Sequence, residues 1–186
     1  MLFRSPGVGG PCLPVNSVQI LHSGKLAGDN LLRMVSLSQE INDGMASHVL
    51  DLLEDGLKSV GKQLNDSTVL ILGVSYKPNV KDIQITPAES VIQNLLAAGA
   101  KIKIYDPYFV STKIFNILTE SSIENGLMGT DAAILITAHN EFRNIDPGFL
   151  VAKSKSLVFV DTRGALDVHV AKKAGLIFRG LGRGKI

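Results

Sequence analysis

The alternation of hydrophobic and polar positions divides the chain into three regions. Residues 1 to about 28 are rich in glycine, proline and polar side chains and show no sustained hydrophobic period. Such a composition is typical of irregular structure. We therefore expect residues 1–28 to form a loop segment.

From about Asn30 to Leu64 the pattern changes to steps of three and four residues, which predicts one long amphipathic helix. Gly44, Gly56 and Gly61 weaken this helix locally. Its apolar stripe is too long for a small domain to cover, so we expect residues 29–65 to mediate a homodimer. The stripe consists of these residues: Met34, Leu37, Ile41, Met45, Val49, Leu52, Leu53, Leu57 and Val60.

Residues 66–186 alternate short apolar runs with helical patterns. Uninterrupted Val, Ile and Leu runs are typical of strands that are covered on both faces, as in parallel sheets. One crossover helix is well marked, because Thr86, Pro87 and Glu89 form a capping signal and Gly99 provides a stop. We predict an α/β fold with a Rossmann-like, doubly wound parallel sheet of about five strands. The strands are expected at residues 68–72, 101–105, 132–136, 157–160 and 176–178.

Composition narrows the functional classes. The 186 residues carry 19 basic and 17 acidic side chains without a basic block, so we expect no nucleic-acid partner. The single cysteine excludes a disulfide within the chain, and its histidines show no metal-ligand spacing. No apolar run approaches a membrane span and the N-terminus lacks a signal peptide's apolar core. We therefore expect a cytoplasmic protein with no membrane partner.

Candidate binding residues follow the strands. Lys77 and Arg163 lie after the first and fourth strands, where ligands of doubly wound sheets bind, although surface charges are the simpler interpretation of most basic residues. We expect the segments after the strands to share one crevice. The first turn lacks the G-x-G-x-x-G fingerprint, so the two cations favour a nucleotide or phosphorylated ligand held differently from a dinucleotide. Asp106 is interpreted equally well as a ribose-binding acid or as part of an ordinary turn. His139 is expected to be a loop or capping histidine, because no acidic partner can be placed beside it.

Cys12, the only cysteine, directly follows a glycine-rich turn. Glycines allow close backbone approach and Pro11 and Pro14 stiffen the loop, so a ligand could meet the thiol here. The alternative is an inert, buried cysteine.

Several ordered motifs resemble the UDP-glucose/GDP-mannose dehydrogenase family, most closely its branch acting on UDP-N-acetyl-hexosamines. The resemblance implies the later part of such an enzyme: a catalytic-cysteine loop (1–28), a central dimerisation helix (29–65) and a C-terminal UDP-sugar-binding domain (66–186). The NAD-binding domain, which precedes the cysteine in the family, is not in this sequence. The motifs are residues 7–15, 40–42, 72–82, 105–107, 137–142 and 160–163.

The resemblance also implies an activity and its residues. In the family, NAD oxidises the C6 hydroxyl of the nucleotide sugar, a cysteine captures the aldehyde as a thiohemiacetal, a second NAD gives a thioester, and water releases the uronate. Cys12 matches that nucleophile, while Lys77 and Arg163 match residues that contact the nucleotide sugar. The glycines that match the loop bordering the sugar are Gly7, Gly9 and Gly10.

This sequence departs from the family pattern at three positions. Asn16 stands where the family usually has an aspartate that handles protons, Pro11 where the branch has histidine, and Gln84 where an arginine serves the NAD side. A neutral amide cannot act as a carboxylate base. Three interpretations follow: part of an NAD-dependent dehydrogenase completed by a separate NAD-binding domain, a truncated or degenerate UDP-sugar-binding dimer without catalysis, or a purely structural remnant.

Overall fold

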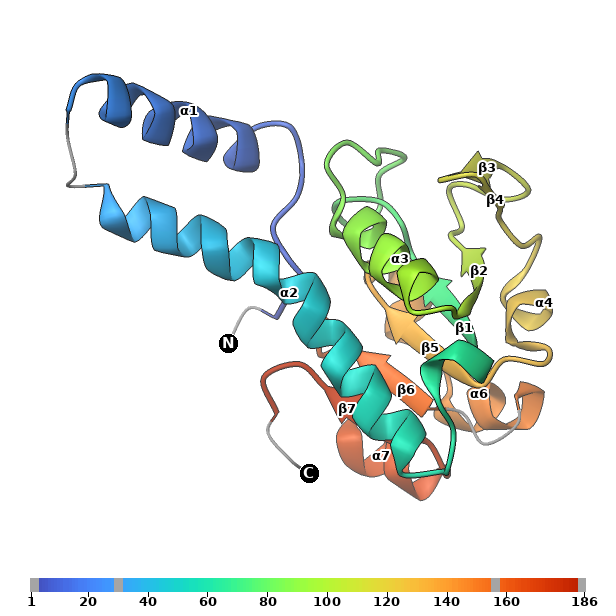
Figure 1. The fold of residues 1–186 in the computed structure, drawn as a ribbon. Helices are drawn as coiled ribbons and strands as arrows, with labels where there is room; N and C mark the ends of the chain where they lie inside the picture. Colours follow the sequence, from blue (N-terminus) through green and yellow to red (C-terminus); the bar gives the residue numbers. More distant parts are fainter. Residues whose placement is uncertain (1–3, 29–31, 155–157, 184–186) are drawn as a thin grey trace.

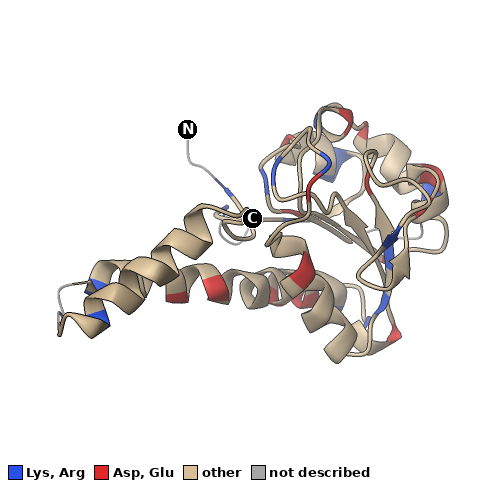
Figure 2. Ribbon diagram, turned by 90° about the horizontal axis from the view of Figure 1, so that it is seen from above, with Lys and Arg blue, Asp and Glu red and all other residues tan. Residues whose placement is uncertain are grey.

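The computed structural model describes residues 4–28, 32–154 and 158–183. An arm of two helices, α1 (Leu13–Leu26) and the first half of α2 (Arg33–Lys58), extends from a compact α/β domain, as two orthogonal views agree (Figures 1 and 2). The predicted starts of the long helix at Asn30 and of the fourth strand at Leu157 lie outside the described residues.

Helix α1 corrects the prediction of a loop over residues 1–28. Among the described residues of this range, 4–12 are irregular and 27–28 form a turn, and the helix has Pro14 in its first turn. None of its residues is buried, and its apolar side chains lie on no single face. A helix that buries no stripe leaves no hydrophobic period in the sequence, which explains why the pattern missed it.

Helix α2 confirms the long helix but ends earlier than predicted. Gly61, with φ of 71°, places the amides of Gly61 and Lys62 on the carbonyls of Lys58 and Leu57 at 3.1 and 3.0 Å. This is a Schellman motif, which stops a helix where glycine adopts a left-handed conformation. Residues Leu64–Asp66 then form a separate 3₁₀ turn.

The sheet confirms the predicted fold class. Five parallel strands lie in the order β2-β1-β5-β6-β7, so the chain reverses direction across the sheet between β1 and β5. The strands are β1 (Thr68–Leu72), β2 (Lys101–Tyr105), β5 (Ala132–Leu135), β6 (Val158–Asp161) and β7 (Ile177–Gly180). A short hairpin of β3 (Lys113–Ile114) and β4 (Ile117–Leu118), which the sequence analysis did not predict, follows β2.

Helices cover both faces of the sheet, and the strands alternate between two cores. Val69 and Ile71 of β1 pack with α2 and α3, whereas Leu70 and Leu72 pack with the helices of the other face. Helix α3 begins and ends as predicted, capped by Thr86 and stopped at Gly99. The other helices of the domain are α3 (Pro87–Ala97), α4 (Ile123–Leu127), α5 (Asn140–Arg143), α6 (Pro147–Lys153) and α7 (Val168–Lys173). No helix in the described ranges is long and apolar enough to cross a membrane.

The base of α2 lies unusually close to the sheet. Gly56 is buried against Val158 of β6, where a Cβ would collide with the valine Cγ1. Directly beside this contact, Arg179 of β7 donates from Nε to Asp55 Oδ2 at 2.6 Å. The missing side chain at position 56 therefore sets the distance between helix and strand.

We predict opposite effects for two glycine substitutions in this helix. Gly56→Ala should lower the free energy of unfolding by about 1–3 kcal/mol, because the added methyl group overpacks the interface with Val158. The matched change Gly44→Ala, at an exposed position with nothing within 4 Å, should raise it by up to ~1 kcal/mol through helix propensity alone. Urea denaturation of both variants measures the difference, and equal effects would contradict the close packing.

Candidate functional site

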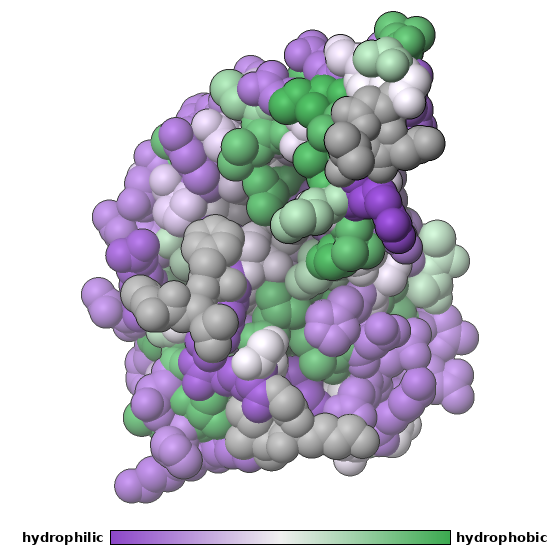
Figure 3. Space-filling model, turned by 90° about the vertical axis from the view of Figure 1, so that its left-hand side faces the viewer, coloured by the Kyte–Doolittle hydropathy of each residue, from purple (hydrophilic) through white to green (hydrophobic). Residues whose placement is uncertain are grey.

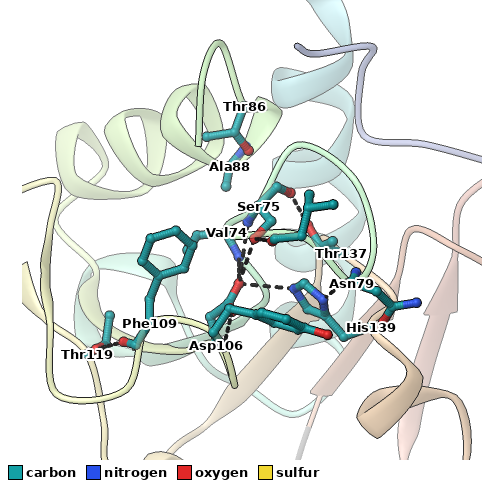
Figure 4. A network of polar contacts seen from close by, with 12 residues as sticks. Val74, Ser75, Asn79, Thr86, Ala88, Asp106, Phe109, Thr119, Thr137 and His139 are labelled. Atoms are coloured by element: carbon teal, nitrogen blue, oxygen red, sulfur yellow. Dashed lines mark hydrogen bonds and ion pairs between the residues drawn. The ribbon is translucent and has the colours of Figure 1, made fainter. Parts of the chain in front are cut away.

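A buried carboxylate joins the loops at the carboxyl edge of the sheet. Asp106, directly after β2, accepts from the amides of Val74 and Ser75 through Oδ2 at 2.8 and 3.3 Å and from the Tyr108 amide through Oδ1 at 2.8 Å. Nε2 of His139 lies 3.1 Å from Oδ2, and both side chains are fully buried (Figure 4). The segments after β1, β2 and β5 are thereby connected through one acid.

The hydrogen bond at the second ring nitrogen of His139 determines the tautomer of the neutral ring. Nδ1 accepts from the amide of Asn79 at 2.9 Å, so the proton of the neutral ring is on Nε2 and is donated to Asp106. The side chain of Asn79 in turn accepts from the Asn140 amide at 2.9 Å. The expectation that no acid lies beside His139 is therefore wrong. Strands β2 and β5 lie on either side of β1, so Asp106 after β2 and His139 after β5 meet above the end of β1. Only the strand order could have indicated that these two residues pair.

The hydrogen bonds around Asp106 also control its ionisation. Burial alone would raise the pKa of this carboxyl group, but the bonds from His139, Val74 and Tyr108 outweigh burial and hold the pKa below its ordinary value. Asp106 is therefore an anion at neutral pH, stabilised entirely by the chain's own donors.

The crevice expected between β1 and β5 is filled by the protein. Gly73, with φ of 82°, lies so close to the next loop that a Cβ would be 2.6 Å from the Thr137 carbonyl oxygen. The Thr137 hydroxyl donates to the Ser75 carbonyl at 2.5 Å in the same place. The glycine therefore serves contact between two loops, and the strand ends do not share one open crevice.

The residues of this domain do not fit NAD. No glycine fingerprint follows β1, and the segment from Gly73 to Thr86 separates that strand from the next helix, so no helix N-terminus faces a pyrophosphate. Asp106, the acid placed to bind a ribose, is buried with both oxygens occupied. The ribose interpretation of Asp106 therefore has no structural support.

The glycine-rich segment lies across the domain and is attached to α2. The side-chain amide of Asn42 brackets the backbone of Val8, accepting from its amide at 2.6 Å and donating to its carbonyl at 3.4 Å. At the start of the segment, the Ser5 hydroxyl accepts from Arg163 Nη1 at 2.9 Å. Sequence reasoning assigned no role to Ser5, and its only signal is a position beside the glycine motif.

Glycines 9 and 10 allow this segment to touch the loop after β1. A Cβ on Gly9 would collide with the Ile85 carbonyl oxygen, and one on Gly10 would lie 2.7 Å from the Tyr76 ring. The Gly10 amide points at the carbonyls of Gln84 and Ile85, each 3.2 Å away. The close approach that these glycines permit is to the chain itself, and the side chain of Gln84 stays exposed.

Cys12 and Asn16 lie one turn apart at the start of α1. Cys12 is the N-cap residue and is exposed, which contradicts the alternative of a buried cysteine. The Asn16 amide donates to the Cys12 carbonyl at 2.9 Å, and the Asn16 side chain is exposed. The Cys12 side chain itself makes no capping hydrogen bond to the helix.

The two predicted cations lie in different settings. Arg163 is half-buried, and burial lowers the pKa of its guanidinium, opposed by the nearby Asp161 carboxylate. Lys77 is exposed, with its ammonium group 5.4 Å from the centre of the Tyr76 ring. Because Arg163 contacts Ser5 while Tyr76 contacts Gly10, the cations stand near opposite ends of the segment from Ser5 to Gly10.

A pocket beside this segment has a volume of about 390 Å³ and lies between the segment, α2 and the chain after β7. It contains Gly7, one of the predicted substrate-binding residues, and borders Ser5, the partner of Arg163. The pocket is lined by Arg4, Ser5, Gly7, Val8, Ser38, Ile41, Asn42, Met45, Leu181 and Gly182.

Comparison with known proteins identifies the family. Residues 70–168 match the family model described as the UDP binding domain of the UDP-glucose/GDP-mannose dehydrogenase family. The chain belongs to this family. The resemblance seen in the sequence motifs is therefore confirmed, and the match covers the sheet from β1 to the start of α7.

Relatives align beyond the family model, over the whole chain. UDP-N-acetyl-D-mannosamine dehydrogenase from Methanocaldococcus jannaschii is 30% identical over 189 residues, covering 100% of this chain and 41% of the relative. UDP-glucose 6-dehydrogenase from Bacillus subtilis is 27% identical, covering 95% of this chain and 38% of its own length. The chain thus spans about two fifths of the length of the curated relatives it matches.

Superposition on solved structures covers both the sheet and the arm of this chain. NDP-N-acetyl-D-galactosaminuronic acid dehydrogenase from Methanosarcina mazei superposes with a TM-score of 0.90 at 25% identity, covering 98% of this chain and 40% of that one. UDP-D-ManNAc dehydrogenase from Pyrococcus horikoshii gives 0.85 at 25% identity with the same coverage.

The Asp106 network predicts a pH-dependent stability. Asp106→Asn should lower the free energy of unfolding at pH 7 by about 3 kcal/mol or more, because buried donors lose their acceptor. A carboxyl group with a lowered folded pKa stabilises above its unfolded value and loses this contribution as the pH falls. The difference from the wild type should therefore shrink below about pH 4.

Urea denaturation from pH 7 to pH 3 measures this effect. Asp51→Asn, on the exposed side of α2, is the matched control and should change the free energy of unfolding by less than about 0.5 kcal/mol. A difference between wild type and Asp106→Asn that stays constant over this range would contradict the role of the carboxylate.

Proposed function

We propose that this chain supplies the UDP-sugar-binding part of an NAD-dependent nucleotide-sugar 6-dehydrogenase, which oxidises a UDP-hexose or UDP-N-acetyl-hexosamine to its uronate. The observation that carries the proposal is the match of residues 70–168 to a UDP binding domain, continued through the cysteine segment and α2 by the M. jannaschii relative. The NAD-binding domain is expected on another part of the enzyme or on a separate chain, because the domain described above does not fit that cofactor.

In this proposal the UDP-sugar lies along the segment from Ser5 to Gly10. Arg163 contacts it at one end and Lys77 at the other, and Gly7, Gly9 and Gly10 border the sugar. A guanidinium and an ammonium group both suit phosphate oxygens. The pocket of about 390 Å³ beside Gly7 offers the room for part of this ligand.

Cys12 is the proposed nucleophile toward the sugar aldehyde. Its thiol is exposed at the start of α1, where an aldehyde can reach it. The sulfur adds to the carbonyl carbon and holds the sugar as a thiohemiacetal. Asn16, one turn along, can hydrogen-bond a water or hydroxyl group but cannot take up a proton as a carboxylate would. Gln84 is the proposed residue on the NAD side.

A second candidate is a non-catalytic UDP-sugar-binding dimer. Asn16 favours it, because a neutral amide replaces the acid at the position beside the cysteine. The two candidates agree on the ligand and differ only in turnover, so NADH formation after addition of an NAD-binding domain separates them. The expected cytoplasmic location belongs to both candidates and is tested by cell fractionation.

Ligand binding by this chain is the first test. UDP and UDP-sugars should raise the melting temperature, whereas NAD should not, and Arg163→Ala should weaken UDP binding about tenfold or more because a charged contact is lost. Lys77→Ala should also weaken binding. Thermal shift and calorimetry measure both effects. Stabilisation by NAD alone would contradict the domain assignment.

The arm of α1 and α2 is the proposed dimer interface. Both helices expose large apolar side chains, and Figure 3 shows apolar residues gathered on this side of the molecule. Two equivalent arms that pack against each other would remove these side chains from water. The exposed residues are Leu13, Val15, Val18, Ile20, Leu26, Met34, Leu37 and Ile41.

A single charge should separate the proposed dimer. Leu37→Glu places a carboxylate in the middle of the apolar face of α2 and should yield a monomer in sedimentation equilibrium, where the wild type is a dimer. The matched change Val170→Glu alters an equally exposed residue on α7 and should leave the dimer intact. A wild-type monomer, or equal behaviour of both variants, would refute this interface.

A further inference from the structure

The loop after β1 is held at its midpoint by the segment that follows β5. Nδ1 of His139 accepts from the backbone amide of Asn79 at 2.9 Å, and the Asn79 side chain accepts from the Asn140 amide at 2.9 Å. Figure 4 shows the His139 ring between Asp106 and Asn79. Two neighbouring hydrogen bonds therefore join the loops, and Lys77 lies two residues before the residue that receives them.

Other hydrogen bonds close the base of the same loop. The Ser75 hydroxyl donates to the Val80 carbonyl at 2.7 Å, and the Tyr76 amide donates to the Asp82 carbonyl at 3.0 Å. These bonds lie within the loop and fix the place where it leaves β1. The contacts of Asn79 fix the position of its midpoint relative to the rest of the domain.

The backbone between Lys77 and Asn79 is stiff. Pro78 has a fixed φ and restricts the conformation of the residue before it, which is Lys77. Asn79 adopts φ of 61°, in the left-handed region that asparagine tolerates better than most residues. The orientation of the Asn79 peptide is therefore transmitted to Lys77, whose exposed side chain forms no ion pair within the described residues.

The ring of His139 is itself held firmly. It is fully buried, and Nε2 lies 3.1 Å from Asp106 Oδ2. Its centre lies 4.9 Å from the centre of the Tyr108 ring and 5.7 Å from that of Phe142. A ring fixed by one hydrogen bond and two aromatic contacts presents Nδ1 in one direction only.

We propose that His139 is a positioning residue for ligand binding: through the Asn79 amide it holds Lys77 where the ammonium group meets the nucleotide sugar. This inference rests on the proposed UDP-sugar function, in which Lys77 contacts the ligand. His139 is buried and acts only through the loop. Ordering the loop before the ligand arrives lowers the conformational entropy that is lost on binding.

Two substitutions of His139 separate its two hydrogen bonds. The side-chain amide of asparagine reaches the position of Nδ1, so His139→Asn keeps an acceptor for the Asn79 amide and removes the donor to Asp106. Glutamine reaches the position of Nε2, so His139→Gln keeps the donor to Asp106 and removes the acceptor for Asn79.

The two variants should rank oppositely in affinity and in stability. His139→Gln should weaken UDP binding about fivefold, the ratio that corresponds to one ordinary hydrogen bond, whereas His139→Asn should stay within about twofold of the wild type. The melting temperature without ligand should fall further in His139→Asn, because the buried Asp106 carboxylate loses a donor. A purely structural role of His139 would give the same ranking in both measurements.

Calorimetric titration with UDP in a second background tests the link to Lys77. If the histidine acts through the lysine, His139→Gln should cause no further loss of affinity in a chain that already carries Lys77→Ala. The matched control His169→Gln makes the same exchange at an exposed position on α7 and should bind UDP as the wild type does. Asn79→Gly serves if His139→Gln is unstable, since it removes the bond to Asn140, loosens the backbone and should weaken UDP binding in the same Lys77-dependent way.

The outcomes separate this inference from the proposed function. A loss in His139→Gln that has the same size with and without Lys77 would overturn the inference and leave the proposed function standing. UDP binding of wild-type strength in both His139→Gln and Asn79→Gly, or in Lys77→Ala, would do the same. Failure of UDP to bind the wild type would refute the proposed function and the inference together.

Discussion

The hydrogen bonding of one buried carboxylate organises the functional edge of this protein. Asp106 gathers the amides after β1 and β2 and the ring of His139 after β5, so three loops that would otherwise be independent form a single rigid surface. A buried anion of this kind is tolerated only when its donors are complete. The network therefore explains both why the loops are ordered and why the usual ligand position of a doubly wound sheet is closed.

With the centre closed, the pocket of about 390 Å³ lies beside the chain that follows β7. There the chain segment before α1 returns to the domain, and Ser5 meets Arg163 while Asn42 of α2 holds Val8. The pocket is built from this meeting of the first described residues with the last ones. Figure 1 shows the described segment before α1 and the described chain after β7 on the same side of the molecule, beside α2.

Sequence patterns predicted the scaffold well because its signals are local. Runs of Val, Ile and Leu marked all five strands of the sheet, and Thr86 with Pro87 marked the start of α3. Helix α1 was missed because it buries no residue and so carries no period. The pairing of His139 with Asp106 and the contact of Arg163 with Ser5 depend on strand order and chain return, which no spacing along the sequence encodes. Cys12, Lys77 and Arg163 were selected by motif, and of these Arg163 contacts Ser5 at the edge of the pocket.

The contact of Gly56 with Val158 has a mechanical consequence. Together with the ion pair of Arg179 and Asp55, this contact fixes the orientation of the base of α2 on the sheet. From Gly56 to Met34 the helix runs roughly 33 Å at its regular rise per residue. Over this length, a small change in the angle between the base of α2 and the sheet becomes a large displacement at the far end of the helix. The packing of Gly56 therefore governs where the far end of the arm can meet another molecule.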